Sequence, residues 1–425
     1  MRILFLSHWY PVPPNNGGKL RVYHLANGLA RRHEVTLVSV TYPTFDGPTV
    51  ENDPLFDRCV RNIVFRKYPR NAWNFAHVAT NWGPLPQRLW TLLSSLRPSR
   101  VRDANDPDLV TLLRNIRLEE AYDAVWVSMD IMAENARRAG FDRIVLDLPD
   151  VDALSFSSIL RQRGWYLSKP LHYGELAKIW IHEKRLPRRF WRLVVCRSDE
   201  VTFFKGSEER VHVVPNGVAE FKPTSPRREQ SGELLFVGTL NYLPNVDAVQ
   251  YFCRSILPLI RQQHHHARLV VVGLKPAAEV LALHNGQTIE VVGTVDDVAP
   301  FFESASVVVT PIRSGAGTRL KILEALVRGK AVVSTSKGIE GLELRDGIDL
   351  MLADSPEQFA AACMTLLADA DKRRSLAASG RVHALERYHW DRSVEAAERA
   401  LGIGADSDHA SSIQPYLPKP MTSRV

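Results

Sequence analysis

Short runs of apolar residues recur along the chain, separated by stretches long enough for a helix. The first run, residues 2–7 (RILFLS), has the character of a buried β-strand, and residues 35–40 form the next one. Residues 19–32 between them place apolar side chains at helical spacing, namely Leu20, Tyr23, Leu25, Leu29 and Ala30. This β-α-β order predicts the opening of a parallel, doubly wound sheet.

The same alternation begins again in the second half of the chain. Further strands are expected at residues 122–128, 143–148, 191–196 and 211–214, and then at 233–237, 268–273, 288–292, 307–309 and 331–333. The stretch 221–232 between the two sets contains prolines and charges and has the composition of a linker. The pattern therefore predicts an α/β protein with two Rossmann-like domains, which a length of 425 residues can accommodate.

The clearest candidate for a ligand site lies in residues 306–334, which read as strand, glycine-bearing loop, helix and strand. Gly315 and Gly317 make the loop flexible, and Thr318 is a plausible N-cap for the helix. Arg319 and Lys321 then fall at the start of the helix, where the macrodipole is positive and an acid would be favoured. Two cations, free amides and room for a ligand predict a diphosphate site.

Glu324 follows one turn after Lys321, and its carboxylate could accept hydrogen bonds from ribose hydroxyls. The alternative for this stretch is a surface helix with scattered charges and a Lys321–Glu324 ion pair. Gly17-Gly18, between the first strand and its helix, lies where doubly wound sheets bind ligands, although these glycines could equally serve only the turn. The fingerprint G-x-G-x-x-G is absent here, which argues against an NAD or FAD enzyme.

Two further patterns suggest a metal, but each has a simpler interpretation. Asp150 and Asp152 could hold a divalent cation or could simply cap the next helix. Three adjacent histidines at 264–266 cannot all face one ion from regular structure, so we expect an exposed loop. Residues 41–117 carry many tryptophans and arginines, with a helical stretch at 90–97, and fit a membrane- or acceptor-facing surface as well as a packed subdomain.

The charge is uneven along the chain. Residues 1–228 hold 34 Lys and Arg against 24 Asp and Glu, whereas residues 229–425 hold 20 against 23. A basic first half fits an anionic membrane surface or a phosphate-bearing acceptor, or is simply solubility charge. No nucleic-acid-binding motif accompanies it. The four cysteines lack metal or disulfide spacing, and no signal peptide or 18-residue apolar run is found, which favours the cytoplasm.

Six motifs, in this order along the chain, resemble the group 1 (family 4) glycosyltransferases. They are PNGV at 215–218, FVG at 236–238, VGTVDDV at 292–298, GAGTRLKILEA at 315–325, GKAVVST at 329–335 and GIEG at 338–341. The resemblance covers residues 1–401 and includes Gly17-Gly18 and its helix. It implies the GT-B fold, with two Rossmann-like domains facing across a cleft.

In this fold the acceptor would bind to residues 1–215 and the nucleotide-sugar donor to residues 216–389. A last helix at 390–402 would cross back to the first domain, and residues 403–425 form a polar tail that we expect to be disordered. The resemblance implies retention of the anomeric configuration without a metal or cofactor. It assigns Arg319 and Lys321 to the leaving diphosphate, and a set of further residues to donor binding, namely Gly17, Gly18, Gly238, Gly293, Val295, Gly315, Gly317, Thr318 and Glu324. Gly293 and Val295 would present their backbone to the base.

This sequence also departs from the family pattern. Ala316 stands where the E-x(7)-E motif has its first acid, and Thr239 and Pro244 replace the usual Arg and Lys. A histidine common in the first domain is replaced near residues 128–130. The hypothesis is a cytoplasmic transferase, peripheral at the inner membrane face if it contacts lipid, that moves a sugar from a nucleoside-diphosphate donor to a glycan or lipid-linked acceptor. The alternatives are a nucleotide-sugar epimerase and an inactive scaffold that binds nucleotide-sugar or glycan.

Overall fold

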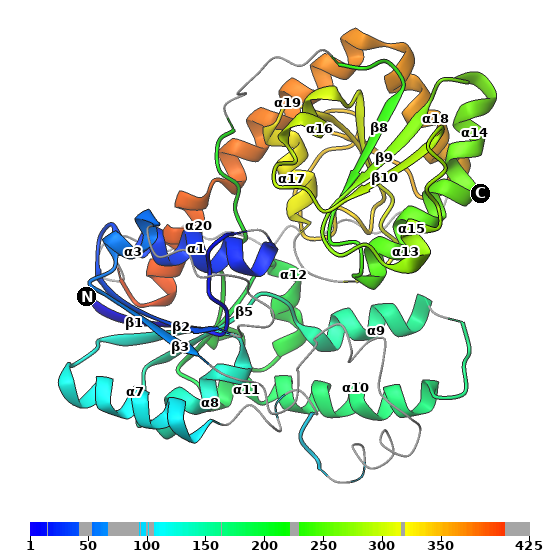
Figure 1. Ribbon diagram of the computed structural model, residues 1–425. Helices are drawn as coiled ribbons and strands as arrows, with labels where there is room; N and C mark the ends of the chain where they lie inside the picture. Colours follow the sequence, from blue (N-terminus) through cyan, green and yellow to red (C-terminus); the bar gives the residue numbers. More distant parts are fainter. Residues whose placement is uncertain are drawn as a thin grey trace.

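The protein contains two parallel β-sheets, each covered by helices on both faces (Figure 1). The computed structural model describes residues 1–14, 16–41, 53–66, 93, 95–98, 101, 106–162, 164–221, 229–315 and 319–403. The first sheet ends with Val213 and the second begins with Glu233. The predicted α/β class and its two doubly wound domains are confirmed.

The first sheet has seven strands in the order β3-β2-β1-β4-β5-β6-β7. Its strands are β1 (Arg2–Ser7), β2 (Glu34–Thr41), β3 (Arg61–Arg66), β4 (Ala124–Ser128), β5 (Ile144–Leu148), β6 (Arg192–Val195) and β7 (Val211–Val213). Since successive side chains of a strand point to opposite faces, β1 supplies two separate cores. Ile3 and Phe5 pack on one face of the sheet, and Leu4 and Leu6 pack on the other.

Each of these cores is closed by its own set of helices. One face is covered by α1 (Gly17–Ala30), α3 (Pro54–Arg58) and α20 (Trp390–Ala400). The other is covered by α7 (Pro107–Glu119), α8 (Asp130–Arg138), α9 (Asp152–Gln162), α10 (Lys169–Lys184) and α11 (Leu186–Arg189). Past β6, the short helices α12 (Ser198–Val201), η1 (Thr202–Phe204) and η2 (Glu208–Arg210) lead to β7.

The second sheet has six strands in the order β10-β9-β8-β11-β12-β13. They are β8 (Glu233–Val237), β9 (Arg268–Val272), β10 (Ile289–Gly293), β11 (Val307–Thr310), β12 (Ala331–Ser334) and β13 (Met351–Leu352). One face packs against α13 (Leu243–Tyr251), the π-type turn η3 (Phe252–Ile256), α14 (Leu257–Gln263), α15 (Ala278–Leu281) and α18 (Pro356–Ala368). The other packs against α16 (Ala299–Ser304), α17 (Leu320–Val327) and α19 (Ala370–Tyr388).

Helix α20 follows the second domain in the chain but packs on the first. Its Trp390 ring stacks on His24 of α1 with 4.6 Å between centroids. A Cβ atom added to Gly28 of α1 would lie 2.2 Å from Val394 Cγ2, so the two helices touch where α1 has no side chain. The two domains are therefore joined at two places in the chain, through residues 214–232 and through α20 (Figure 1).

Some elements differ from the sequence-based expectations. The helical stretch from Lys169 to Arg189 is two helices, because the chain turns at Arg185 ahead of Pro187. The helical stretch that begins at Leu243 contains the π-type turn. Of the helix predicted at 90–97, residues 90–92 and 94 lie outside the described residues, and residues 95–97 are not helical. The tail 403–425 lies outside the described residues apart from residue 403.

Candidate functional site

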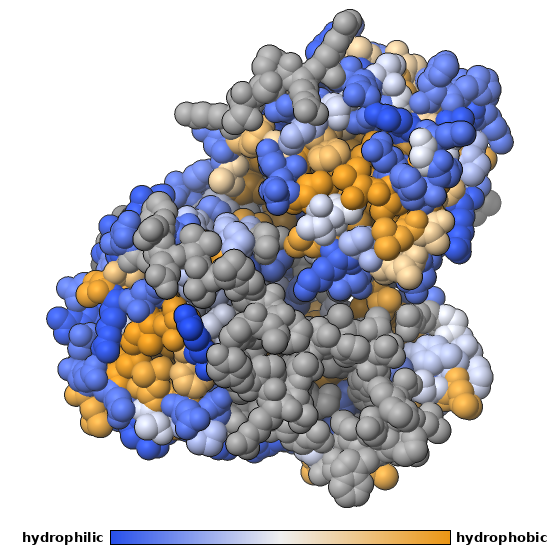
Figure 2. Space-filling model, viewed as in Figure 1, coloured by the Kyte–Doolittle hydropathy of each residue, from blue (hydrophilic) through white to orange (hydrophobic). Residues whose placement is uncertain are grey.

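The two domains face each other across a cleft into which the carboxyl ends of strands from both sheets open, and Figure 2 shows the outline of the molecule hollowed between them. Doubly wound sheets bind ligands at such ends. Hydrogen bonds between described residues cross this cleft. The amide of Gly315 donates to Ser158 Oγ at 3.2 Å, and Gln162 Nε2 donates to Asp247 Oδ2 at 2.8 Å.

The start of α17 lines the second-domain wall of this cleft. Arg319 occupies the N-cap position, one residue later than the predicted cap Thr318, which lies outside the described residues together with Ala316 and Gly317. The first turn of α17 contains no acid, and Arg319 makes no capping hydrogen bond with its side chain. The positive end of the α17 dipole therefore lies next to the positive charge of Arg319.

Arg319 is almost buried, and its guanidinium is held from two sides. Its Nη2 donates to the carbonyl of Ser314 at 3.1 Å, and its side chain also hydrogen-bonds to the hydroxyl of Tyr242. Tyr242 in turn bonds to Ser155 of the first domain. The guanidinium is thus fixed in position at the domain interface before any ligand arrives.

Lys321 lies next to Arg319 in an unusual environment for an ammonium group. Its Nζ donates to Asn245 Oδ1 at 2.6 Å and lies 4.4 Å from the centre of the Phe236 ring. Burial, and then the neighbouring charge of Arg319, lower the pKa of Lys321 to about 7. A negative ligand at this point would restore the charged form and would be bound more tightly because of it.

The glycines predicted for donor binding make room around this lysine. A Cβ on Gly238 would lie 2.7 Å from Lys321 Nζ and 2.9 Å from Asn245 Nδ2, so no larger residue fits without moving them. Gly315 and Gly293 adopt φ angles of 92° and 81°, which L side chains rarely adopt. Gly293 ends β10, and its carbonyl accepts a 2.8 Å bond from the amide of Gly273.

Gly17 and Gly18 approach the same part of the cleft from the first domain. Asn16 caps α1 through a 3.0 Å bond from the amide of Lys19. A Cβ on Gly18 would fall 1.6 Å from the Trp9 ring, and one on Gly17 would lie 3.3 Å from Leu320 of α17. The structure thus brings the glycine pair next to the helix that carries Arg319 and Lys321.

The two remaining residues predicted to bind the donor are Val295 and Glu324. Val295 is half-buried behind β10. Glu324 accepts a 2.9 Å bond from Arg328 Nη2, and it keeps about a third of its side chain exposed. The alternative Lys321–Glu324 pair is wrong, because Lys321 is turned towards Asn245.

Sequence reasoning missed a buried ion pair in the first-domain wall. Arg21 of α1 binds Asp147 of β5 in a bidentate manner, with Nη2 2.7 Å from Oδ1 and Nε 2.8 Å from Oδ2. Its Nη1 donates to the carbonyl of Val214 and to Asn216 Oδ1, both at 2.9 Å. Asp147 could have indicated this pair, because it is a charged residue inside the apolar run 143–148. Nothing in the sequence identified Arg21 as its partner.

Two histidines stand near the end of β4, where the family histidine is replaced. His182 Nε2 lies 2.9 Å from Asp130 Oδ2. His8 is buried after β1, and burial lowers its pKa to about 3, against the attraction of Asp130, so it is neutral at physiological pH. Met129, which joins β4 to Asp130, has a φ of 71°. Strained backbone of this kind is found at functional sites.

A charged cluster lies beside the carboxyl end of β5. Arg197 is buried and contacts Asp199 at 2.5 Å, and its Nη1 is 3.6 Å from Glu340 of the second domain. Burial raises the pKa of Glu200 to about 8, opposed by Arg197. Asp150 is an exposed residue, but desolvation by the surrounding protein raises the pKa of its carboxyl, opposed by the charges of Arg319, Arg197 and Arg21.

Within the described ranges, no three His, Cys, Asp or Glu side chains gather where they could hold a metal ion. Asp152 is the first residue of α9, and the histidines at 264–266 follow α14 in a turn. Of the helices that the structure describes, none has the length and apolar content needed to cross a bilayer.

Comparisons with known proteins agree with this arrangement. Residues 231–369 match the family model described as "Glycosyl transferases group 1". An uncharacterised 44.6 kDa protein in the cps region of Klebsiella pneumoniae is 20% identical over 372 residues, which cover 84% of this chain and 89% of that protein. The family model bears out the predicted family over residues 231–369.

Solved structures share the fold at low identity. The crystal structure of HepE from Anabaena in complex with UDP and glucose has a TM-score of 0.62 at 15% identity, covering 95% of this chain and 99% of HepE. Sucrose-phosphate synthase from Thermosynechococcus elongatus has a TM-score of 0.68 at 15% identity, covering 94% and 98%.

Proposed function

We propose that this chain, whose residues 231–369 form a group 1 glycosyltransferase domain, transfers a sugar from a nucleoside-diphosphate donor to a glycan or lipid-linked acceptor. The observation that carries the proposal is the pair of adjacent cations, Arg319 and Lys321, at a helix start without an acid in its first turn. A UDP complex of a protein with the same fold supports this choice of donor.

Arg319 and Lys321 would stabilise the charge that grows on the diphosphate as the bond to the sugar breaks. Groups fixed in advance in a partly dry cleft do this well, and the loss of one donor costs on the order of 100-fold in rate. Gly17 lies next to Leu320 of α17 and Gly18 follows it in the chain, so the amides of this pair would assist. Glu324 would hold the ribose, and the backbone at Gly293 and Val295 would meet the base.

We further propose that the reaction retains the anomeric configuration and needs neither a metal nor a cofactor. The two cations replace the charge that a bound metal would supply, and the leaving phosphate takes the proton of the acceptor hydroxyl on the retained face. Transfer that is unchanged by a chelator supports this account. Transfer that depends on an added divalent cation contradicts it.

The site is tested by thermal stability against a panel of nucleoside diphosphates. A ligand that binds only the folded state raises the melting temperature, and at 100 times its Kd it adds about 2.7 kcal/mol. We expect one base to stabilise the wild type and Arg319→Ala to lose that effect. Arg374→Ala, which removes an exposed arginine of α19, should keep it. Failure of every diphosphate at millimolar concentration would reject the proposal.

A surface of the first domain supports peripheral contact with an anionic membrane. Tyr173, Trp180 and Ile181 of α10 are exposed by 46%, 41% and 51% and share one side of the helix, because they are seven and eight residues apart. Apolar residues exposed in this way mark interaction surfaces.

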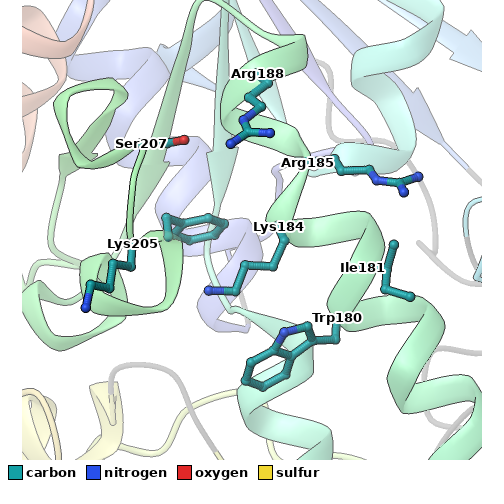
Figure 3. A pocket seen from close by; sticks show the side chains of 8 residues that line it. Trp180, Ile181, Lys184, Arg185, Arg188, Lys205 and Ser207 are labelled. Atoms are coloured by element: carbon teal, nitrogen blue, oxygen red, sulfur yellow. The ribbon is translucent and has the colours of Figure 1, made fainter.

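The polar border of this surface is basic. A pocket of about 280 Å³ beside Trp180 and Ile181 is lined by Lys184, Arg185, Arg188, Lys205, Phe204 and Ser207. Figure 3 shows Trp180, Ile181, Lys184 and Arg185 extending from the same helix, with Lys205 on the segment opposite. The lining of this pocket holds four cations and no acid, although Glu208 beside it interacts with Lys205. Such a basic border around an apolar stripe is complementary to anionic headgroups, at about 1 kcal/mol for each Lys or Arg near the lipid.

We expect the protein to sediment with phosphatidylglycerol vesicles at low salt and to be released as salt screens the attraction. Binding should fall in Trp180→Ala and in Arg188→Ala, and Arg374→Ala serves as the control. If the protein does not sediment with these vesicles at low salt, α10 does not contact the membrane.

A further inference from the structure

One carboxylate of the first domain, that of Asp150, interacts electrostatically with Arg319 of the proposed diphosphate site. Asp150 lies in the short turn between β5 and α9, at the carboxyl end of its strand. Helix α9, which begins two residues later, touches the second domain through Ser158, the acceptor of the 3.2 Å bond from the amide of Gly315. The turn therefore faces the loop that leads into α17.

Asp150 differs from every other acid around it. Asp147 is bound by Arg21, Asp199 by Arg197, and Glu183 accepts 3.0 Å bonds from the amides of Asp152 and Ala153. Within the described ranges, the Asp150 carboxylate makes no hydrogen bond and no ion pair, although Arg319, Arg197 and Arg21 lie within electrostatic range. The amides at the start of α9 are already satisfied by Glu183, so that helix end is not an anion site.

We propose that Asp150 binds a hydroxyl group of the donor sugar in the cleft. This inference rests on the proposed function. The sugar is bonded directly to the diphosphate, so a ligand held by Arg319 places its sugar beside the groups that face Arg319. A carboxylate accepts hydrogen bonds from neutral hydroxyls well, and the three arginines around it offset its repulsion of the phosphates. Asp150 would then supply a carboxylate to the sugar from the first domain. Position 316 of the second domain offers no carboxylate, because it is an alanine.

The test measures the affinity of each variant for UDP and for UDP-hexoses. Asp150 should strengthen the binding of one UDP-hexose and should not strengthen the binding of UDP. The probes are UDP and a set of UDP-hexoses (glucose, galactose, N-acetylglucosamine and glucuronic acid), titrated by calorimetry. In the wild type we expect one UDP-hexose to bind more tightly than UDP. In Asp150→Asn this advantage should fall about tenfold, the usual weight of a hydrogen bond to a charged group. Affinity for UDP itself should stay equal or rise a few-fold, since a negative charge near Arg319 is removed.

A pH series adds a readout that a purely structural role would not change. Titration of the terminal phosphate of UDP changes the advantage of the UDP-hexose over UDP alike in both proteins. The readout is therefore the difference in that advantage between the wild type and Asp150→Asn, which should shrink as falling pH protonates Asp150. Asp142→Asn is the matched control, because Asp142 is an exposed aspartate at the opposite end of the same strand.

The outcomes separate this inference from the function on which it rests. If neither UDP nor any other nucleoside diphosphate binds the wild type, the proposed function fails. If UDP binds but no UDP-hexose binds better, or if Asp150→Asn leaves the advantage of the sugar unchanged, only the role of Asp150 is overturned. A variant that tightens UDP and leaves that advantage intact would show Asp150 to be a counter-ion of Arg319 alone.

Discussion

The two walls of the cleft hold their cations in different ways. In the first domain, Arg21 is enclosed and matched by Asp147, the Val214 carbonyl and Asn216. In the second domain, burial and then the neighbouring charge of Arg319 lower the pKa of Lys321 to about 7. A matched buried cation stabilises structure, whereas two adjacent cations are held ready for an anion. The difference separates the framework of the cleft from its binding groups.

The largest expected effect comes from breaking the matched pair. Asp147→Ala leaves the Arg21 guanidinium buried without its counter-ion, which costs about 3–5 kcal/mol of the free energy of unfolding. Chemical denaturation of the first domain measures this loss. Asp142→Ala, at the exposed end of the same strand, should change stability by less than about 0.5 kcal/mol. A loss below about 1 kcal/mol in Asp147→Ala would mean that the pair is not what holds α1 to β5.

A smaller effect is expected from a substitution of Gly238, whose lack of a side chain leaves space for Lys321 Nζ in the second-domain wall. The added methyl of Gly238→Ala would press against Lys321 Nζ and Asn245, which must move. We expect about a tenfold loss of nucleoside-diphosphate affinity, with stability reduced by about 1 kcal/mol. Gly164→Ala provides the control for stability, since neither glycine has a left-handed φ and no atom lies within 4 Å of a new Cβ at Gly164. Unchanged affinity in Gly238→Ala would remove Lys321 from the site.

The smallest effect is a shift of protons. A bound diphosphate favours the charged form of Lys321 and raises its pKa from about 7, so binding near pH 7–8 should take up a fraction of one proton. Affinity should then weaken as pH rises from 7 to 9, because the free lysine loses its charge. Calorimetry in buffers of different ionisation enthalpy measures the uptake. Lys321→Arg, which stays charged, should show none, and equal heats in all buffers for the wild type would contradict the account.

Much of the fold could be predicted from short-range pattern. Strand β1 begins and ends where the apolar run does, and Gly329, with a φ of 68°, follows the C-cap of α17. Arg319 and Lys321 stood out because they break a local rule at a helix start. Local rules carry this information because strand faces and helix ends are set by neighbours a few residues away.

The rest depended on residues far apart in the chain. Arg21 and Asp147 are 126 positions apart, and the Lys321–Asn245 bond spans 76. Asp150 drew attention only as half of a metal motif, since its relation to Arg319 exists only when two domains close on each other. The second sheet also gained β13, whose two residues are too few to give a pattern.

The most direct test is a calorimetric titration of UDP into three proteins: the wild type, Arg319→Ala, and the double variant Arg21→Met/Asp147→Leu. Replacement of a buried ion pair by apolar residues is often tolerated, so the double variant keeps a framework. We predict that Arg319→Ala weakens UDP binding by at least tenfold and that the double variant stays within about threefold of the wild type. Equal loss in both variants, or wild-type binding by Arg319→Ala, would contradict the division of the cleft into framework and binding wall.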